Sequence, residues 1–337
     1  MTAQRSGRAP SMADVAAAVG VSHQTVSRVL NDSSLVRPDT RERVLAAIAE
    51  LGYRRNNAAR ALASHRSRRI GMVAAHLGYY GPSTLATAVQ AAGHESGYDV
   101  SLIAVEHLDA DTLRDAIERL LGEAVEAIVV AVAHTALLTE AHTIDAPVPV
   151  VLAQGVTSGQ PLAVGIDQTA GGRTATDHLL GLGHTRVAHV TGPLGWAEAD
   201  QRRVGWQEAH TARGLEPGPE IEGDWTPESG YRAGLRLAED ASVSAVFVAN
   251  DAMAVGVLKA LVESGRRVPD DVSVCGYDDT PESAFLLPSL TTVRQSFDVL
   301  GRQVVDLTLR ALAGDEAPTA PLLAPELKVR GSTAPPA

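Results

Sequence analysis

Three polar residues in the second half of the chain form a set that suits a hydroxyl-rich ligand. Arg202, Asn250 and Asp278 each come after a short apolar run of the kind that forms a buried strand. A guanidinium, an amide and a carboxylate at neighbouring strand ends place donors next to acceptors, which suits vicinal hydroxyls. Trp225, in the run G-D-W-T-P, adds a flat apolar plate of the kind that stacks on a sugar ring. For the three polar residues together we favour contact with a ligand.

A second polar set lies on one face of a predicted helix near the N-terminus. The run from Ser11 to Asn31 predicts two short helices joined at Gly20, with Ser11 and Ser22 as their N-caps. The second helix has an outer face without carboxylates, formed by His23, Gln24, Thr25, Ser27 and Arg28. Amides reach base edges, and hydroxyl and guanidinium groups reach phosphates, so this face suits DNA. The alternative is an ordinary helical hairpin with a solvated face.

The charge distribution favours nucleic-acid binding at the same end of the chain. The 337 residues carry a net charge of −11. Residues 1–69 hold 12 Lys and Arg against 5 Asp and Glu, a net charge of +7, and the remainder holds 17 against 35, a net charge of −18. A basic head on an acidic body concentrates attraction for DNA at one end.

Two further helices are expected between this pair and the body. Pro38 suits the first turn of a third helix that ends at Gly52, with an inner stripe formed by Val44, Leu45, Ile48 and Leu51. Asn56 suits the cap of a short alanine-rich helix in which only Leu62 is large. A helix this short is marginal in water, so it should fold only when another surface covers it.

The rest of the chain alternates apolar strands with helices. We expect strands at Ile70–Ala75, Val100–Val105, Ala127–Val132, Val148–Leu152, Val187–Thr191, Ala245–Ala249 and Val272–Tyr277. Helices are expected at Pro82–Ser96, Thr112–Leu121, Thr169–Leu182 and Ala252–Ser264, and through Arg202 and Trp206. This pattern predicts two doubly wound parallel sheets, with a ligand cleft at the strand ends. Asp251 and Asp279 lie beside that cleft, and each could simply cap the helix that follows.

Motifs along nearly the whole chain resemble the LacI family of bacterial repressors. In the head these are the helix-turn-helix, T-R-E-R-V at 40–44 and N-x-x-A-R-x-L at 56–62. In the body they are G-P at 192–193, R-x-x-G-W at 202–206, V-A-N-D at 248–251, G-Y-D-D-T at 276–280 and P-S-L-T-T-V at 288–293. The resemblance implies an all-α helix-turn-helix head joined by a hinge helix to an α/β two-lobed periplasmic-binding-protein-like body.

The resemblance also implies which residues contact DNA and effector. DNA contacts are expected from Ser11, Ser22, His23, Gln24, Thr25, Ser27, Arg28, Asn31, Thr40, Asn56, Ala59 and Leu62. His23 and Gln24 should read base edges, and the hinge leucine should wedge into the minor groove. Effector contacts are expected from Tyr79, Pro82, Leu85, Gln154, Arg202, Trp225, Asn250, Asp278, Gln295 and Phe297. The effector would be a small sugar, galactoside-like by preference, with a purine, a phosphorylated sugar or a co-repressor role as alternatives.

The expected domain boundaries follow the same motifs. Residues 1–55 form the DNA-binding domain, 56–69 the hinge helix and linker, 70–330 the effector-binding and dimerisation domain, and 331–337 a disordered tail. The N-terminal lobe takes about 70–164 and 294–322, and the C-terminal lobe about 165–293 and 323–330. A member of the family that this sequence resembles closely at its effector-site motifs has an aspartate where Gln154 stands, which leaves the identity of the sugar open. Since the tail has no leucine heptad, a homodimer is expected.

Two other classes of protein fit the sequence less well. An enzyme is disfavoured because no nucleophile elbow, Walker loop or H-E-x-x-H motif is present, and G-G-R-T-A at 171–175 lacks dinucleotide-binding spacing. A periplasmic sugar-binding protein would need a signal peptide and has no use for a basic head. The lone Cys275 and the scattered histidines predict neither a metal site nor a cofactor. The absence of a long apolar run predicts a cytoplasmic protein with no membrane contact.

Overall fold

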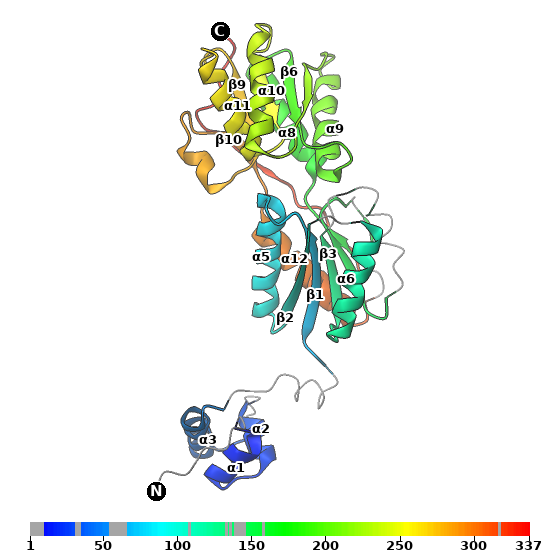
Figure 1. Cartoon of the computed structure of the whole chain (residues 1–337), viewed down its shortest axis with the longest axis vertical. Coiled ribbons are helices and arrows are strands. Elements are labelled where there is room, and N and C mark those ends of the chain that lie inside the picture. Colours follow the sequence, from blue (N-terminus) through cyan, green and yellow to red (C-terminus); the bar gives the residue numbers. More distant parts are fainter. Residues whose placement is uncertain are drawn as a thin grey trace. The chain divides into compact units, whose positions relative to one another are not determined.

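The computed structural model divides the chain into two compact units, Met1–Ser67 and Arg68–Ala337 (Figure 1). It describes residues 10–30, 35–53, 66–106, 109–131, 134, 137, 146–156, 159–315 and 318–337. The predicted DNA contacts Asn31, Asn56, Ala59 and Leu62, and with them the predicted hinge helix, lie outside the described residues.

The first unit contains three helices, α1 (Met12–Val19), α2 (His23–Leu30) and α3 (Pro38–Leu51). Ser11 caps α1 in a capping box with Asp14, and Gly20 ends the helix in the left-handed conformation at φ 73°. The backbone N–H of Thr25 donates to the Ser22 hydroxyl at 3.1 Å, so Ser22 starts α2 as predicted. These caps satisfy backbone groups that the short helices leave unpaired.

The helix α3 turns a slightly different face inward from the one that the sequence predicts. Val44 and Ala47 are buried against α1 and α2, whereas Leu45 is 50% exposed. Leu45 is therefore a surface residue, because α3 is in contact with its neighbours over a narrower stripe than its apolar residues span.

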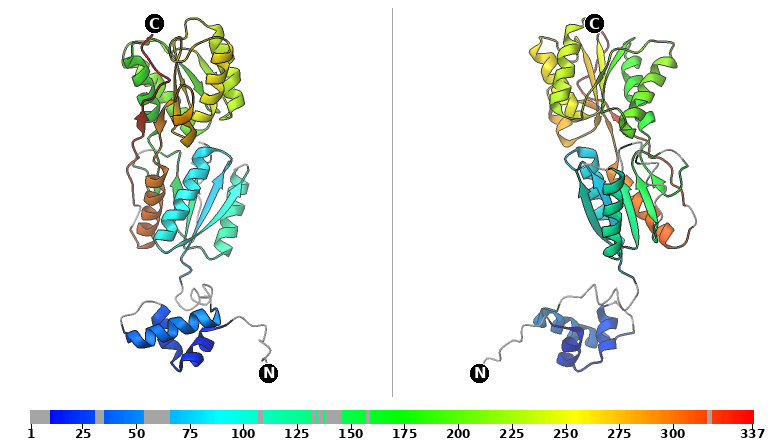
Figure 2. Two further views of the ribbon diagram at one scale, coloured as in Figure 1. Left: turned by 90° about the vertical axis from the view of Figure 1, so that its left-hand side faces the viewer. Right: turned by 45° about the vertical axis from the view of Figure 1, so that its right-hand side comes forward.

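The N-terminal lobe of the second unit is a five-stranded parallel sheet. Its strands are β1 (Arg69–Ala75), β2 (Asp99–Val105), β3 (Ala127–Ala131), β4 (Val150–Ala153) and β5 (Ala163–Val164), in the order β2-β1-β3-β4-β5. The helices α5 (Tyr80–Glu95) and α12 (Phe297–Leu312) cover one face, and α6 (Ala110–Gly122) covers the other (Figures 1 and 2). Both faces of the sheet are thus buried, which explains the continuous apolar strands.

The C-terminal lobe is a six-stranded sheet in the order β11-β10-β9-β8-β6-β7. Its strands are β6 (Val187–Thr191), β7 (Glu220–Glu222), β8 (Ala245–Val248), β9 (Ser273–Asp278), β10 (Thr291–Arg294) and β11 (Glu326–Lys328). The helices α8 (Gln168–Gly181) and α9 (Ala197–Thr211) pack on one face, and α10 (Pro227–Glu239) and α11 (Asp251–Glu263) pack on the other. A short 3₁₀ helix, η1 (Pro281–Phe285), follows β9.

Two features of this lobe differ from the expectation of a purely parallel sheet with a disordered tail. The edge strand β11 pairs with β10 in the antiparallel direction, because the chain returns from the N-terminal lobe at that edge. The predicted disordered tail, 331–337, is wrong. Ser332 is fully buried, its hydroxyl donates to the carbonyl of Val274 at 2.6 Å, and the N–H of Ala334 donates to the Ser273 hydroxyl at 2.9 Å. These hydrogen bonds hold the tail against the sheet.

The chain crosses between the two lobes at three places in the sequence. It leaves the N-terminal lobe before α8, returns between β10 and α12, and enters the C-terminal lobe again before β11. The first two crossings bring Gln168 and Gln295 side by side in the buried region between the lobes, where their side chains share a hydrogen bond of 2.8 Å. Within the described part of the chain, no helix is long and apolar enough to cross a membrane.

Candidate functional site

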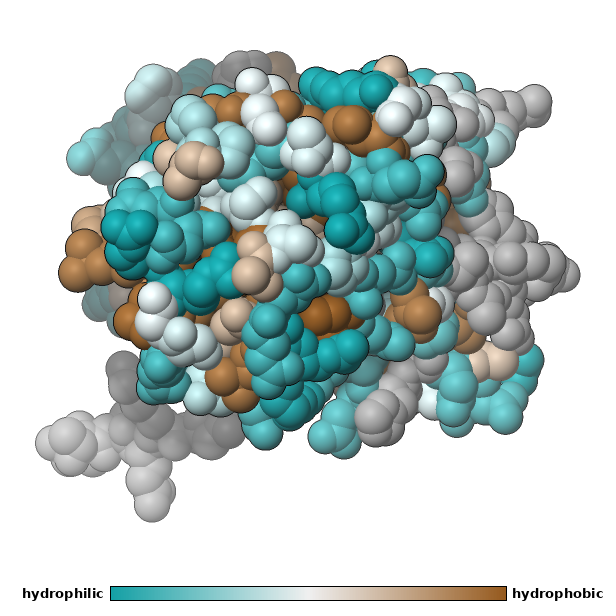
Figure 3. Space-filling model, turned by 90° about the horizontal axis from the view of Figure 1, so that it is seen from above, coloured by the Kyte–Doolittle hydropathy of each residue, from teal (hydrophilic) through white to brown (hydrophobic). Residues whose placement is uncertain are grey.

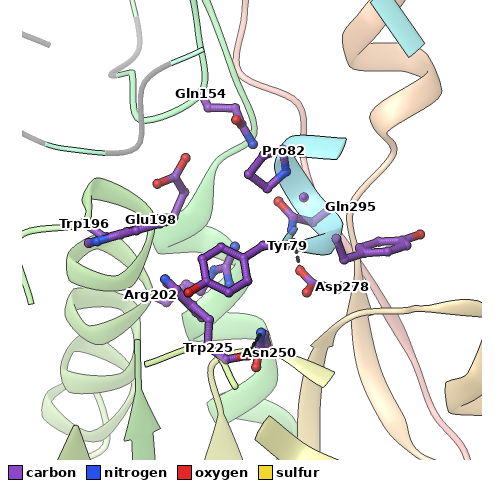
Figure 4. Close-up of a pocket in the computed structure, with 12 residues that line it drawn as sticks. Tyr79, Pro82, Gln154, Trp196, Glu198, Arg202, Trp225, Asn250, Asp278 and Gln295 are labelled. Atoms are coloured by element: carbon purple, nitrogen blue, oxygen red, sulfur yellow. Dashed lines mark hydrogen bonds between the residues drawn. The ribbon is translucent and has the colours of Figure 1, made fainter. Parts of the chain in front are cut away.

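A cavity lies between the two lobes of the second unit (Figure 4). Both lobes contribute to its lining, which consists of Tyr79, Tyr80, Gly81, Pro82, Gln154, Trp196, Glu198, Arg202, Trp225, Asn250, Asp278 and Gln295. Its mixture of aromatic and polar walls is typical of a small-molecule site. The cavity brings together Arg202, Asn250 and Asp278, although Arg202 lies on the helix α9 and not at the predicted strand end.

Arg202 lies on α9 and is 4% exposed. Its Nε donates to Oε1 of Gln168 at 2.9 Å, and a terminal nitrogen donates to the carbonyl of Ala249. The guanidinium carbon lies 3.8 Å from the ring centroid of Tyr277, in cation–π geometry. These contacts, all within the C-terminal lobe, fix the orientation of the Arg202 side chain.

Asn250 combines a structural role with its place in the cavity wall. Its Oδ1 accepts a hydrogen bond of 2.8 Å from the N–H of Met253 and so caps α11, and its Nδ2 donates to the carbonyl of Trp225 at 3.1 Å. One amide hydrogen and one acceptor lone pair remain after these two bonds. The orientation of the amide is therefore fixed before any ligand arrives.

Asp278 ends β9 and is joined to the crossings between the lobes. Its Oδ1 accepts a hydrogen bond of 2.6 Å from Nε2 of Gln295, which in turn accepts from Gln168. Burial raises the pKa of Asp278, the Arg202 guanidinium opposes this and the nearby Asp251 adds to it, with a net pKa of about 7. A continuous chain of buried hydrogen bonds thus runs from Asp278 through the two glutamines to Arg202.

Trp225 is buried at the base of the cavity, below Tyr79 in the view of Figure 4. A Cβ atom at Gly192 would lie 2.2 Å from its indole ring, so only glycine fits at the end of β6. The indole N–H has no hydrogen-bond partner among the described residues. An unpaired buried donor beside a cavity is available to a ligand oxygen.

The sequence did not single out Glu198 and Trp196, and the structure places both in the cavity wall. Glu198 lies in the first turn of α9, and burial raises its pKa to about 7. Neither of its carboxylate oxygens has a hydrogen-bond partner among the described residues. Trp196 precedes α9, with its ring centroid 5.8 Å from that of Trp225 and 6.0 Å from that of Tyr79.

Tyr79, Pro82 and Gln154 line the cavity from the N-terminal lobe as predicted, together with Tyr80 and Gly81, for which the sequence carries no distinct signal. The predicted contacts Leu85 and Phe297 do not line it. Both belong to the buried core of that lobe, because their helices turn them toward the sheet. Phe297 lies behind the wall, with its ring 6.0 Å from that of Tyr80.

The two aspartates beside the cavity are not helix caps. Asp251 is buried and accepts hydrogen bonds from the hydroxyls of Ser283 and Thr292, both at 2.6 Å. Asp279 forms ion pairs with Arg294 and Arg330. Asn250 caps α11 instead, so Asp251 and Asp279 tie η1, β10 and the tail to the lobe.

Most of the described candidate DNA contacts lie on the surface of the first unit. His23, Gln24 and Arg28 are exposed on α2, and Thr25, Ser27 and Thr40 are half-buried. The hydroxyls of Ser11 and Ser22 accept hydrogen bonds from the first turns of α1 and α2. No carboxylate stands on α2, so its polar face is compatible with a polyanion.

Comparison with known proteins identifies the family. Residues 11–56 match the model of bacterial regulatory proteins of the lacI family, and residues 176–333 match a periplasmic binding protein-like domain. The chain is 36% identical to the lactose operon repressor of Escherichia coli (strain K12), over 95% of its own length and 89% of the repressor's. The chain belongs to the LacI family. It is therefore a DNA-binding transcriptional regulator with the expected head and two-lobed body.

Solved structures of the family share the whole architecture. A lac repressor dimer bound to operator and the anti-inducer ONPF superposes with a TM-score of 0.86 at 34% identity, covering 97% of this chain and all of that chain. The complex of the transcriptional regulator CelR with cellobiose superposes with a TM-score of 0.69 at 33% identity, covering 96% of this chain and 99% of that chain. Among the described residues, no group of three or more His, Cys, Asp or Glu side chains is placed to hold a metal ion.

Proposed function

We propose that this LacI-family regulator represses a carbohydrate-utilisation operon as a homodimer on a palindromic operator, and that a small sugar between its lobes releases it. The observation that carries the proposal is the cavity wall, in which Arg202, Asn250 and Asp278 offer donors and acceptors above the plate of Trp225. This combination suits the hydroxyls and the apolar face of a pyranose, and a galactoside is the preferred candidate.

The DNA side of the proposal rests on α2. Exposed Gln24 and His23 are suited to reach base edges in the major groove, and Arg28 is suited to a phosphate or a guanine. Ser22, Thr25, Ser27 and Asn31 would hold phosphates, with Ser11 and Thr40 at the flanks. Asn56, Ala59 and Leu62 would belong to the hinge that enters the minor groove.

Exposed apolar side chains on the C-terminal lobe support the homodimer. Val262, Phe285 and Leu287 are 60%, 84% and 94% exposed, and Val255 is 40% exposed. Val255, Val262 and Leu287 line one shallow depression between α11 and the end of η1. The end of the lobe is otherwise mostly hydrophilic (Figure 3). Exposed apolar side chains beside Lys259 and Glu263 suit a surface that a protein partner covers, and the structure of the lac repressor bound to operator is a dimer.

Release would follow from a change in the arrangement of the lobes. A sugar that touches both lobes binds one arrangement better than the other, and that difference in affinity is the source of the signal. The hinge segments leave the paired N-terminal lobes, so a rotation of those lobes would separate them. Separated hinges would lose the surface that keeps their marginal helices folded.

The proposal is tested by gel retardation of a palindromic fragment taken from upstream of the protein's own gene. The purified protein should retard this fragment and not a scrambled one, and a titration of lactose, cellobiose or methyl β-galactoside should release it. Stronger retardation with the sugar would show a co-repressor instead. No retardation under any condition would contradict the operator role.

A further inference from the structure

Glu198 is the one carboxylate in the described cavity wall to which no side chain donates a hydrogen bond. It is 6% exposed, and only the backbone amides of Gly155 and of Glu198 itself lie close enough to lower its pKa, too far for well-formed hydrogen bonds. A buried ionised carboxylate without partners is costly, so such a group persists where a ligand supplies the missing donors. The other acid of the wall, Asp278, already accepts from Gln295.

The charges around the cavity disfavour an anionic ligand. Arg202 is the one cation among the described lining residues, and two of its nitrogens already donate hydrogen bonds to Gln168 and Ala249. Two carboxyl groups, those of Glu198 and Asp278, stand against this single guanidinium. A phosphate placed here would face both acids and find few donors that are not already in use.

Glu198 and Asp278 lie on different sides of the cavity. In Figure 4, Glu198 lies next to Trp196 and below Gln154 on one side, whereas Asp278 and Gln295 lie on the other. A ligand that fills the cavity therefore meets one carboxyl group on each side, Glu198 on one and Asp278 on the other. The partly exposed ring of Trp196 flanks the Glu198 side, and the buried ring of Trp225 forms the base.

We propose that Glu198 is a specificity-determining residue, and that it selects an uncharged sugar whose hydroxyls donate to its carboxylate, against phosphorylated sugars and other anions. This inference rests on the proposed function, because it names the chemical class of the effector for the same cavity. A cationic amino sugar would pair with Glu198 but would lie near the guanidinium of Arg202, so a neutral ligand fits both groups best. Hydrogen bonds to an ionised group are about twice as strong as neutral ones, which gives Glu198 a large share in selectivity.

The test compares two isosteric variants on the same helix. Glu198→Gln removes the charge from the cavity, and Glu208→Gln removes one from the exposed face of α9 as a matched control. Binding is followed by the fluorescence of tryptophan, since two of the three tryptophans, Trp196 and Trp225, line the cavity. The probes are lactose, cellobiose, methyl β-galactoside, galactose 6-phosphate, glucose 6-phosphate, glucosamine and hypoxanthine.

We expect a neutral sugar to bind the wild-type protein best and the phosphorylated sugars to bind at least tenfold more weakly. Glu198→Gln should lower the affinity for the best neutral sugar by about tenfold to a hundredfold, and should reduce the difference in affinity between that sugar and the phosphorylated sugars. The affinities of Glu208→Gln should stay within about twofold of wild type. Cooperative thermal unfolding of Glu198→Gln at a temperature no lower than that of wild type shows that the variant is folded.

Three results would overturn the inference. One is a phosphorylated sugar or hypoxanthine as the best ligand, another is glucosamine as the best ligand, and the third is equal affinity of wild type and Glu198→Gln for the best neutral sugar. A phosphorylated sugar or glucosamine as the best ligand, or equal affinity of the two proteins, leaves the proposed function standing, because a sugar still binds the cavity. Hypoxanthine as the best ligand would contradict the sugar effector of the proposed function as well. Failure of every probe to bind the wild-type protein would instead contradict the proposed function, and the assignment of Glu198 with it.

Discussion

Replacing Glu198 by glutamine should stabilise the ligand-free protein at high pH. The buried carboxyl has a pKa of about 7, raised from 4.5 by burial, so ionising it costs folding free energy. Below about pH 4.5 the group is protonated in both the folded and the unfolded state, and it costs nothing. Between about pH 4.5 and pH 7 the carboxyl ionises in the unfolded state but stays protonated in the folded state. The wild-type protein therefore loses stability over this window, and the loss is complete above pH 7. Glutamine does not titrate and should not show this loss.

The full magnitude follows from the pKa difference of about 2.5, at about 1.4 kcal/mol for each pH unit, which gives about 3.5 kcal/mol, most of it between pH 4.5 and pH 8. The difference in unfolding free energy between Glu198→Gln and wild type should therefore grow by about 3 kcal/mol between about pH 4.5 and about pH 8. For a unit of this size the difference in Tm should change by roughly 6–10 °C. Thermal unfolding followed by circular dichroism at both pH values, without sugar, measures it.

The Glu208→Gln variant serves as the control, because Glu208 is exposed on the same helix. Its Tm should differ from that of wild type by the same small amount at both pH values. A Glu198→Gln variant whose Tm difference does not change with pH would show that the carboxylate is solvated or paired in solution. That result would refute the reasoning from burial.

Three further predictions concern DNA binding and its control. Gln24→Ala should cost roughly 1–3 kcal/mol on the operator and relax preference at one base pair of each half-site, and equal loss on operator and random DNA would make Gln24 a phosphate contact. Arg202→Ala should remove the response to sugar and lower the Tm, because it leaves buried acceptors unpaired, whereas Arg203→Ala, which loses only a surface ion pair, should respond normally in the same retardation assay. Leu62→Ala should weaken operator binding far more than random-DNA binding in competition assays, and equal weakening would count against a minor-groove wedge.

Much of the fold follows from local rules that act on short stretches of sequence. Ser11, Gly20 and Ser22 mark the ends of α1 and the start of α2 because capping depends on backbone groups only a few residues away. The apolar strands were predictable because burial on both faces leaves little room for polar residues. Asn250 and Asp278 could be placed in one cavity because parallel strands end at the same edge, whereas Arg202 reaches it from the second turn of α9.

The helix α10 was missed because of its glycines. A Cβ at Gly230 would lie 2.0 Å from the backbone of Met253, and one at Gly234 would lie 2.7 Å from Ala260. Glycine lowers helix propensity, yet here it lets α10 pack closely on α11. In the same way, Gly171 and Gly172 allow α8 to approach Tyr277 and α9, so the glycine pair serves packing.

The remaining misses depend on tertiary structure. Glu198 reads in the sequence as an acid that favours the N-terminus of a helix, and only the fold shows that the helix turns it into a cavity. Leu85 and Phe297 share the apolar character of a ligand wall, but packing places them one layer behind it. The tail is rich in proline, and its binding through Ser332 depends on hydrogen bonds to Thr291 and Val274, which lie 41 and 58 residues earlier in the chain.

The most direct test of the account is whether sugar and operator weaken each other equally. Operator affinity is measured with and without a saturating amount of the best-binding sugar, and sugar affinity is measured with and without saturating operator. We predict that both affinities fall by the same factor, roughly 5- to 150-fold, because the two ligands favour different arrangements of one molecule. An operator affinity that does not change when the cavity is filled would contradict the claim that a sugar between the lobes controls DNA binding.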